Sequence, residues 1–534
     1  MLPTPRHVSA TSPASTASPA SAAPAHVCPE TRRPYVLGAA ILASALGFID
    51  GSVLAIAIPQ IRDSLDASFA QAQWVANAYV LLLAALLLLG GAAGDRFGVR
   101  RTFGFGIALF TAASLACALV PSAPWLIAAR VVQGAGAAVM VPCSLALIAR
   151  NYPRADRGRA IGLWSSASAL MTTAGPVLGG LVLTWGDDAW RWVFAINLPL
   201  GALALLILRR VPDDPGTHGE PLDTIGATLA TVALGTFALG LTLLGGEAIV
   251  LPAGLSNPWA LMGVGLALAV AFAWWEARAA HPMVRLSLFR SRAFSGANAA
   301  TLALYAALGG FLFFAPMQII VGWGLSELYA SLVFLPMGLL IAALSPPAGR
   351  WADRHGPRLP LTLGPAIVGA GLLAVAWANH GAGGGAGAER DFWFALLPAV
   401  ALVGVGLGLT VSPLSSAVML AVDDSASGTA SGVNNMVARM ANLFAIAGLG
   451  ALAATAYEAS VATSGLAPAA RESLAAAGFG ERLAGALFTA RNVEAQSAAM
   501  TAAFMRVVLA TAALAFAAAL LGWWTQGRPR AERS

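Results

Sequence analysis

Long apolar segments alternate with short polar connections along almost the whole chain. Each segment is long enough to cross a bilayer core of about 30 Å as a helix of roughly 20 residues. The absence of alternating ten-residue strand patterns favours an all-α polytopic membrane protein over a barrel. Punctuation by Gly, Pro and Arg predicts fourteen helices, at residues 35–58, 72–94, 102–120, 125–149, 160–185, 192–208, 223–244, 258–276, 293–317, 328–349, 358–378, 391–420, 432–456 and 500–523.

A charged turn occurs twice and divides these helices into repeats. "GGAAGDRFGVRR" (90–101) follows the second helix, and "SPPAGRWADRHGPR" (345–358) follows the tenth. Without the seventh and eighth helices, each turn follows the second helix of a six-helix set, so the arrangement is predicted to be six plus two plus six. The predicted units are a tail at 1–34, a bundle at 35–210, a linker pair at 223–276, a second bundle at 293–523 with a long external loop at 457–499, and a tail at 524–534.

Arginine is concentrated in the connections that follow even-numbered helices. The positive-inside rule therefore predicts that these connections and both termini are cytoplasmic. Residues 1–34 are rich in Ala, Ser, Thr and Pro, which predicts a disordered cytoplasmic tail. The arginines in question are Arg96, Arg100, Arg101, Arg150, Arg154, Arg157, Arg159, Arg209, Arg210, Arg278, Arg285, Arg290, Arg292, Arg350, Arg354 and Arg358.

Composition narrows the functional classes. The chain is 58% hydrophobic and 10% charged, and its net charge of +6 is explained by topology rather than by nucleic-acid binding. It contains no lysine, which argues against a Gly-x-x-x-x-Gly-Lys nucleotide site, and its three cysteines and six histidines show no metal-ligand spacing. We therefore expect no cofactor, no metal and no enzymatic activity. A channel is also disfavoured, because no filter sequence or ring of charge is evident.

Several ionisable residues fall within predicted spans. Arg439, in "SGTASGVNNMVARM" of the thirteenth helix, is one such charge, and for it a packing pair is as plausible as a role in transport. Asp50 and Arg130 are the two that carry the candidate chemistry. Asp50 lies in "FIDGSVLAIAIPQI" of the first helix, and Arg130 lies in "RVVQGAGAA" of the fourth. An arginine in this position costs roughly 2.5–3.5 kcal/mol on insertion scales, so an intramembrane partner or a wet cavity is expected. Asp50 is the leading candidate for proton coupling, because low-dielectric surroundings favour the protonated form of a carboxyl group. A purely structural role, with Asp50 fixed by Arg130 or by backbone donors, is the alternative.

The repeated turn resembles the loop signature of the major facilitator superfamily, approximately Gly-x-Leu-Ala-Asp-Arg-x-Gly-Arg-Lys. Ala93 and Val99 depart from that pattern. The resemblance implies a conformational latch, in which charge-assisted pairs hold helices together in one state and release them in another. The latch residues would be Gly91, Asp95, Arg96, Gly98 and Arg101 in the first copy and Gly349, Asp353, Arg354 and Gly356 in the second.

Further motifs resemble the fourteen-helix drug:proton antiporters of the EmrB/QacA type. Helix four carries Arg-x-x-Gln-Gly at Arg130, Gln133 and Gly134, a motif that the family links to proton transfer. "MTTAGPVLGG" in helix five is similar to the family's antiporter motif, with Met171 in place of the usual first glycine. The Asp50 segment, "WRWVFAINLPLG", "LDTIGA" and "SGTASGVNNMVARM" are also similar to this branch. The antiporter-motif residues that match are Gly175, Pro176, Gly179 and Gly180.

The resemblance implies a proton-coupled carrier that exports amphipathic or hydrophobic compounds by rocker-switch alternating access in a lipid bilayer. Export of one metabolite, siderophore or lipid, or proton-coupled uptake, is the alternative. The resemblance also allows an adaptor protein in the periplasm as a partner. Helix-borne aromatic residues that could line the substrate cavity, or equally face lipid or core, are Phe48, Tyr79, Tyr305, Phe311 and Phe314.

Overall fold

The computed structural model describes residues 28–213, 216, 221–245, 257–381, 388–422, 427–483 and 487–526. Within these residues every regular element is helical, and fourteen helical segments are long and apolar enough to cross a membrane. The predicted fold class and number of spans are therefore confirmed.

The first half of the bundle contains the first six spans. Its sixth span is interrupted at Ile196, where α6 gives way to α7. The elements are α1 (Arg33–Leu65), α2 (Phe69–Phe97), α3 (Val99–Leu119), α4 (Ala123–Asn151), α5 (Arg154–Leu183), α6 (Trp190–Ala195) and α7 (Asn197–Leu208).

The second half contains the last six spans, two of which include a π-helical turn. The π-turns are η3 (Gln318–Gly322), which continues α10, and η4 (Phe392–Leu396), which precedes α15. The other elements are α10 (Arg292–Met317), α11 (Glu327–Leu332), α12 (Phe334–His355), α13 (Pro360–Gly381), α14 (Ala388–Asp391), α15 (Leu397–Leu420), α16 (Ser427–Ala462), α17 (Pro468–Ala477) and α18 (Ala490–Thr525).

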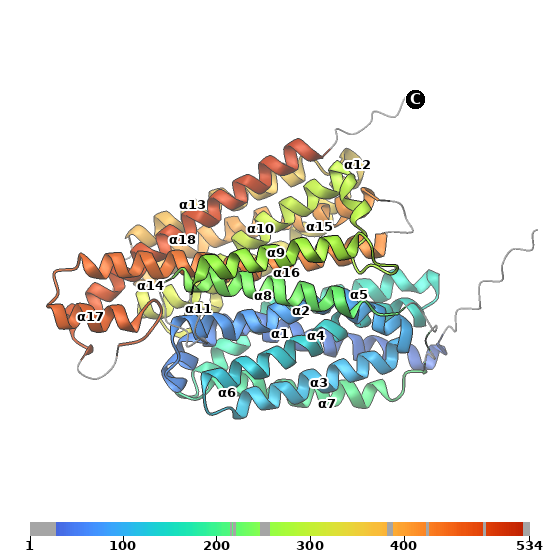
Figure 1. The fold of residues 1–534 in the computed structure, drawn as a ribbon, viewed down its shortest axis with the longest axis horizontal. Coiled ribbons are helices and arrows are strands. Elements are labelled where there is room, and N and C mark those ends of the chain that lie inside the picture. Colours follow the sequence, from blue (N-terminus) through green and yellow to red (C-terminus); the bar gives the residue numbers. More distant parts are fainter. Residues whose placement is uncertain are drawn as a thin grey trace, which may run out of the picture.

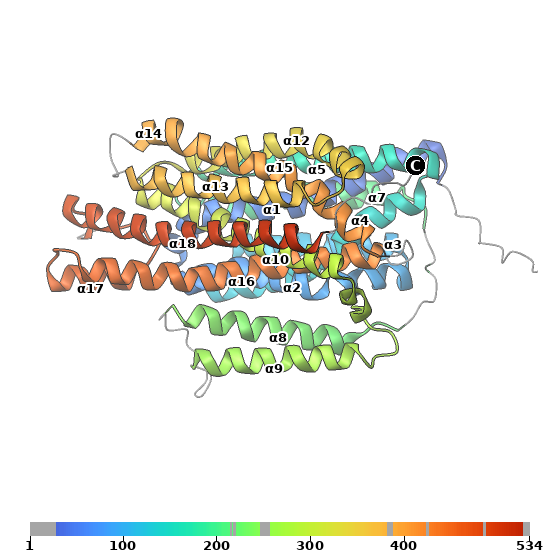
Figure 2. The same ribbon diagram turned by 90° about the horizontal axis from the view of Figure 1, so that it is seen from above.

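The two halves lie side by side, and the extra pair covers one flank. Figure 1 shows the first half in blue and teal against the second half in yellow to red. Helices α8 (Thr224–Leu243) and α9 (Pro258–Glu276) form a separate layer beside the bundle (Figure 2). Helix α8 packs on α2 of one half and on α16 of the other. The pair therefore spans the seam between the halves on that flank.

The helices extend further than the apolar pattern alone indicates. Helices α16 and α18 have 36 residues each, which corresponds to about 54 Å at 1.5 Å per residue, so both continue beyond a bilayer core. Much of the predicted loop at 457–499 is accordingly helical, and α17 lies within the remainder. Hydropathy underestimates these ends because polar turns continue a helix without adding apolar length.

The predicted tail at 1–34 is partly ordered. Cys28 is buried, its N–H donates to the carbonyl of Asn151, and α1 begins at Arg33. Residues 1–27 and 527–534 of the two predicted tails lie outside the described residues. Helix α1 begins and α18 ends at the same end of the bundle (Figure 1), which is called the terminal end below.

The duplicated turn has the same backbone geometry in both halves. Gly98 ends α2 at φ 92°, and Gly356 ends α12 at φ 85°. Both values lie in the region that glycine adopts readily and that side chains with a Cβ avoid. Each glycine follows its aspartate, Asp95 or Asp353, by three residues. The internal repeat read from the sequence is thus visible in the fold.

Candidate functional site

Close contact between α2 and α4 builds the centre of the first half. A Cβ at Gly134 of α4 would stand 2.4 Å from the carbonyl oxygen of Tyr79 on α2. Only a glycine allows that approach. As a result the Tyr79 ring lies against Arg130, with 4.3 Å between the guanidinium carbon and the ring centroid. The helix-four motif therefore positions a cation–π contact.

The two predicted proton-coupling residues form a buried ion pair. Arg130 Nη1 donates to Asp50 Oδ2 at 2.6 Å and to Gln133 Oε1 at 2.7 Å. Gln133 Nε2 donates in turn to Asp50 Oδ1 at 2.9 Å. Asp50 and Arg130 are each 1% exposed. Gln133 thus bridges both members of the pair, and the motif residue has a defined contact.

The pair is supported by further polar groups of the same half. Arg130 Nε donates to the carbonyl oxygen of Val75, and Gln133 Nε2 also reaches Ser114 Oγ. Ser114 Oγ accepts from Asn197 on α7 and donates to the carbonyl of Phe194. A desolvated pair needs such extra hydrogen bonds, because removing two charges from water costs several kcal/mol per ion, as an order-of-magnitude figure. We call Asp50, Arg130 and Gln133 the acid–base cluster.

Open space borders this cluster on one side. A Cβ at Gly51, next to Asp50, would meet no atom within 4 Å. Helix α1 is packed by α4, α5 and α7 of its own half and by α10 of the other. Gly51 is exposed, so this space is accessible from the surface of α1, while Asp50 itself stays covered.

A second polar network closes the end opposite the termini. Arg62 in the last turn of α1 is 2% exposed, and its Nη1 and Nη2 donate to the carbonyls of Phe479 and Ala477. Nη2 also pairs with Glu481 Oε2 at 2.9 Å. These partners are the last residue of α17 and two residues that follow it in the second half. Arg62 therefore ties the first half to the second, and we call this contact region the seal.

Glu327 at the start of α11 extends the seal. Its Oε1 accepts from Arg482 Nη2 at 2.5 Å and from Gln60 Nε2 of α1 at 3.3 Å. Gly180 on α5 is packed so tightly here that a Cβ would stand 2.6 Å from Ser331 Oγ of α11. Part of the antiporter motif thus lies in the seal between the halves.

The other glycines of this motif pack α5 on α1. A Cβ at Gly179 would stand 2.1 Å from Val53 Cγ1, and one at Gly175 would stand 2.8 Å from Ser52 Oγ. Pro176 lies within α5 between them. The motif therefore fixes two close helix contacts, α5 with α1 and α5 with α11.

Two of the aromatic residues for which cavity, lipid and core were all left open are buried in this conformation. Phe311 and Phe314 are fully buried, and the Phe314 ring packs against Phe69 and Phe479 of the seal. The apolar pattern could not separate these roles, because a seam between two halves is as hydrophobic as a core. Tyr79 contacts the acid–base cluster, and Phe48 and Tyr305 are half-buried.

The first copy of the charged turn is held by contacts within its own half. Asp95 Oδ1 pairs with Arg150 Nη2 of α4 at 2.5 Å, and Arg101 Nη2 pairs with Asp213 at 2.7 Å. In the second copy, Asp353 and Arg354 are exposed and form no ion pair with any described residue. The structure therefore places the N-terminal turn in a helix-to-helix contact and gives the second turn no equivalent one.

Asp95→Ala is expected to slow transport turnover without loss of substrate affinity. The Asp95–Arg150 pair is partly exposed, so its contribution to folding is at most about 1 kcal/mol, and a change of that size in one conformation slows turnover up to roughly fivefold. Initial rates and KM of substrate flux check this. Asp353→Ala is the matched control and should have the smaller effect; an unchanged rate in Asp95→Ala would reduce the turn to a topological marker.

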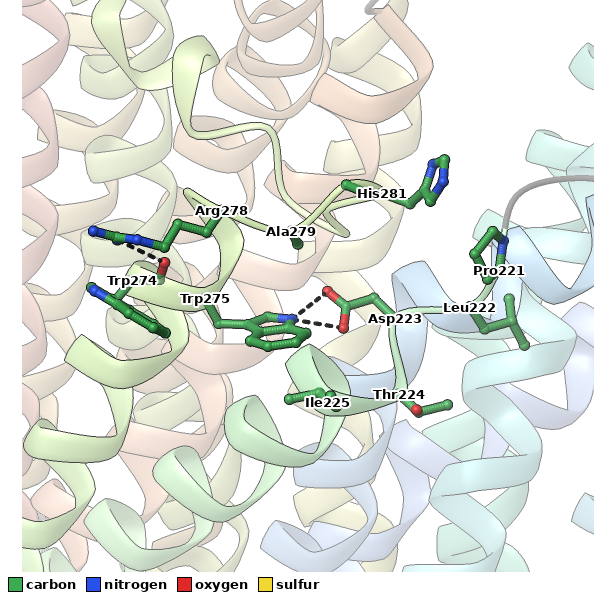
Figure 3. Close-up of a pocket in the computed structure, with 11 residues that line it drawn as sticks. Pro221, Leu222, Asp223, Thr224, Ile225, Trp274, Trp275, Arg278, Ala279 and His281 are labelled. Atoms are coloured by element: carbon green, nitrogen blue, oxygen red, sulfur yellow. Dashed lines mark hydrogen bonds between the residues drawn. The ribbon is translucent and has the colours of Figure 1, made fainter.

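A separate pocket of about 420 Å³ lies at the terminal end of α8 and α9 (Figure 3). Asp223 caps α8 by accepting from the N–H of Gly226, and it also accepts from Trp275 Nε1 of α9. Figure 3 shows the Trp275 ring pointing at that carboxylate, with Arg278 above Trp274. These contacts explain the "LDTIGA" stretch as a clamp that joins α8 to α9. The pocket is remote in the sequence from the acid–base cluster and shares no lining residue with it.

The seal was not foreseen from the sequence. The sequence places Arg62 in a short external connection, because Arg62 follows the apolar part of α1. Its partners at Ala477, Phe479 and Glu481 are more than 400 residues away, and no local pattern links them. The one available signal was the charged Glu327 at the edge of an apolar span.

A duplicated helical bundle with an acid–base cluster buried in one half and a seal between the halves defines a membrane carrier. Comparison with known families agrees with that class. The sequence model of the Major Facilitator Superfamily matches residues 40–446. The chain therefore belongs to the Major Facilitator Superfamily, a family of transport proteins.

Relatives and solved structures agree with this membership. Multidrug resistance protein Stp of Mycobacterium tuberculosis is 32% identical over 426 residues, which cover 78% of this chain and 75% of that protein. Methylenomycin A resistance protein of Streptomyces coelicolor is 31% identical, with 78% and 86% covered. The crystal structure of a bacterial homolog of the human lysosomal transporter Spinster has a TM-score of 0.65 at 18% identity, with 94% and 100% covered. That likeness concerns the fold alone.

Proposed function

We propose that this protein exports amphipathic or hydrophobic small molecules in exchange for protons by alternating access. The buried Asp50–Arg130 pair is the observation that carries the proposal. An acidic side chain within a membrane span costs free energy, and such residues usually have a function. The names of the relatives, which include multidrug resistance and antibiotic resistance and export proteins, support export as the direction.

We place the terminal end in the cytoplasm of a bacterial plasma membrane. The excess of arginine in the connections at that end supports this orientation. The seal then closes the outer side, so the structure corresponds to the carrier before it opens outward. The Gly51 space next to Asp50 is where a substrate taken from the cytoplasm or the inner leaflet would lie.

Exchange follows from a competition for Asp50. In this conformation Arg130 and Gln133 both donate hydrogen bonds to the Asp50 carboxyl group. Opening of the seal would admit a proton that replaces Arg130 as the partner of Asp50. The Arg130 guanidinium would then retain its cation–π contact with Tyr79 and its hydrogen bonds to the Gln133 amide oxygen and the Val75 carbonyl oxygen. On the inner side the reverse exchange would release the proton from Asp50, and the Asp50–Arg130 pair would form again.

The energy of one proton is sufficient for useful export. A charge that crosses about 150 mV releases roughly 3.5 kcal/mol. That energy supports a gradient of a few hundredfold for a neutral compound. Coupling through the single acid Asp50 therefore meets the requirement.

Export of one endogenous compound is the second candidate. It is favoured by relatives named as a probable actinorhodin transporter and a tetracenomycin C resistance and export protein, each 31% identical to this chain. A panel of structurally unrelated substrates separates the two, because a multidrug exporter moves several of them and a dedicated exporter moves one.

Dye efflux from cells tests the proposed function. Cells that express the protein are loaded with a fluorescent amphipathic dye, and retention is followed with and without a protonophore. We expect low retention that rises to the level of empty-vector cells when the protonophore is added. Efflux that continues unchanged under the protonophore would contradict proton coupling, and retention equal to the vector control throughout would contradict export of the dyes tested.

A further inference from the structure

Helix α16 carries a polar stripe within an apolar span. Ser431, Asn435, Arg439 and Asn442 are spaced by four, four and three residues, which places them on one face of the helix. Asn435 is exposed and Arg439 is half-buried, although both lie within the span Thr429–Ala462. Polar groups at this depth are costly against lipid. Helix α16 packs on α2 and α10. A Cβ at Gly309 of α10 would stand 2.5 Å from Asn442 Oδ1, so the stripe faces α10 at that position.

Arg439 differs from the other buried arginines in its lack of a partner. Arg62 and Arg130 each have a carboxylate within 3 Å and carbonyl acceptors beside it. Among the residues that the structure describes, no carboxylate, carbonyl or side-chain oxygen accepts from Arg439. A guanidinium has five N–H donors, so all of them are available to a ligand.

The surroundings of Arg439 are aromatic and carry a net positive charge. Tyr79 of α2 and Tyr305 of α10 both lie within electrostatic reach of its guanidinium. Tyr79 is also within reach of Asp50 and Arg130, so Arg439 adjoins the acid–base cluster. Asp50 and Arg130 neutralise each other. Among the described residues, Arg439 is therefore a cation near this cluster that has no carboxylate partner.

We propose that Arg439 binds an anionic group of the transported compound, and that the substrates are aromatic organic anions such as carboxylates or phenolates. A planar guanidinium pairs with a carboxylate through two parallel hydrogen bonds. The half-buried ring of Tyr305 would contact the apolar part of such a compound. This inference rests on the proposed function, because it names the substrate class of the same central site.

Binding of two xanthene dyes to the purified protein tests the proposal. Fluorescein is anionic and rhodamine 6G is cationic, while both share one ring system. We expect the wild type to bind fluorescein more tightly than rhodamine 6G. Arg439→Gln should weaken fluorescein binding about tenfold to hundredfold, as expected for loss of a charge-assisted pair. Arg439→Lys should keep part of that affinity, and rhodamine 6G binding should not weaken in either variant.

Controls separate this proposal from a folding defect and from the proposed function. Arg506→Gln removes an exposed arginine of α18 and should leave binding of both dyes unchanged, and thermal unfolding in detergent checks each variant. Equal fluorescein affinity in wild type and Arg439→Gln would overturn the anion site, as would a wild type that binds only rhodamine 6G. The assay uses no proton gradient. Flux without proton dependence alongside Arg439-dependent fluorescein binding would therefore contradict the antiport and support the anion site.

Discussion

Asp50→Asn is expected to abolish proton-driven export, with a loss of at least about a hundredfold in the rate. Asparagine keeps the shape of the side chain but cannot gain or lose a proton between pH 5 and 8. It also leaves Arg130 without its counter-ion in a position that is 1% exposed. Breaking a buried pair in this way costs about 3–5 kcal/mol. Substrate flux into inverted vesicles, measured with an imposed pH gradient, checks the loss.

A double variant distinguishes lost coupling from lost folding. Asp50→Asn with Arg130→Gln removes both charges, so no uncompensated charge stays buried, and the bundle should fold. We expect it to bind substrate yet show no proton dependence, whereas Asp50→Glu should retain some coupling. Normal pH-driven export by the folded double variant would remove the acid–base cluster from the mechanism.

Gly180→Val is expected to reduce transport about tenfold to hundredfold by opening the seal. The new side chain would stand where a Cβ already lies 2.6 Å from Ser331 Oγ and 3.0 Å from the Glu327 carbonyl. Overpacking of this kind costs about 1–3 kcal/mol, and here it penalises only the conformation in which α5 meets α11. The carrier should therefore accumulate with its outer side open.

Labelling of an introduced cysteine reports that shift. The cysteine is introduced as Ala477→Cys, in the seal, in a chain whose three native cysteines are replaced. An impermeant maleimide should react with this cysteine faster after Gly180→Val. Gly162→Val on the same helix is the matched control, because a Cβ there meets no atom within 4 Å. Slow labelling in Gly180→Val together with full transport would show that the close approach of α5 and α11 is not required.

Local patterns were sufficient for the architecture and for part of the site. The fourteen spans follow from apolar length, and the duplication follows from the repeated turn around Asp95 and Asp353. The pairing of Asp50 with Arg130 was foreseen only as the structural alternative to proton coupling. Gln133 was expected only as a motif residue, and its bridging contacts needed the helix packing set by Gly134.

The remaining features depend on contacts between distant segments. Arg62 donates hydrogen bonds to backbone carbonyl groups more than 400 residues later in the chain. The pattern of side chains in a sequence does not indicate which backbone carbonyl groups accept such bonds. The sequence did not decide whether Phe311 and Phe314 face a cavity, lipid or the core, because burial in the seal and exposure to a cavity require the same residue type. The partner of Asp95 could not be chosen among the many arginines at the terminal end until α4 placed Arg150 beside it.

The most direct test of the central claim is proton movement driven by substrate in sealed vesicles that contain only this protein. A pH-sensitive dye inside the vesicles is followed while a substrate gradient is imposed, with Asp50→Asn vesicles as the reference. We predict that substrate moving one way drives protons the other way in the wild type and not in the variant. Substrate flux through the wild type with no change in internal pH, and no response to an imposed pH gradient, would contradict the account.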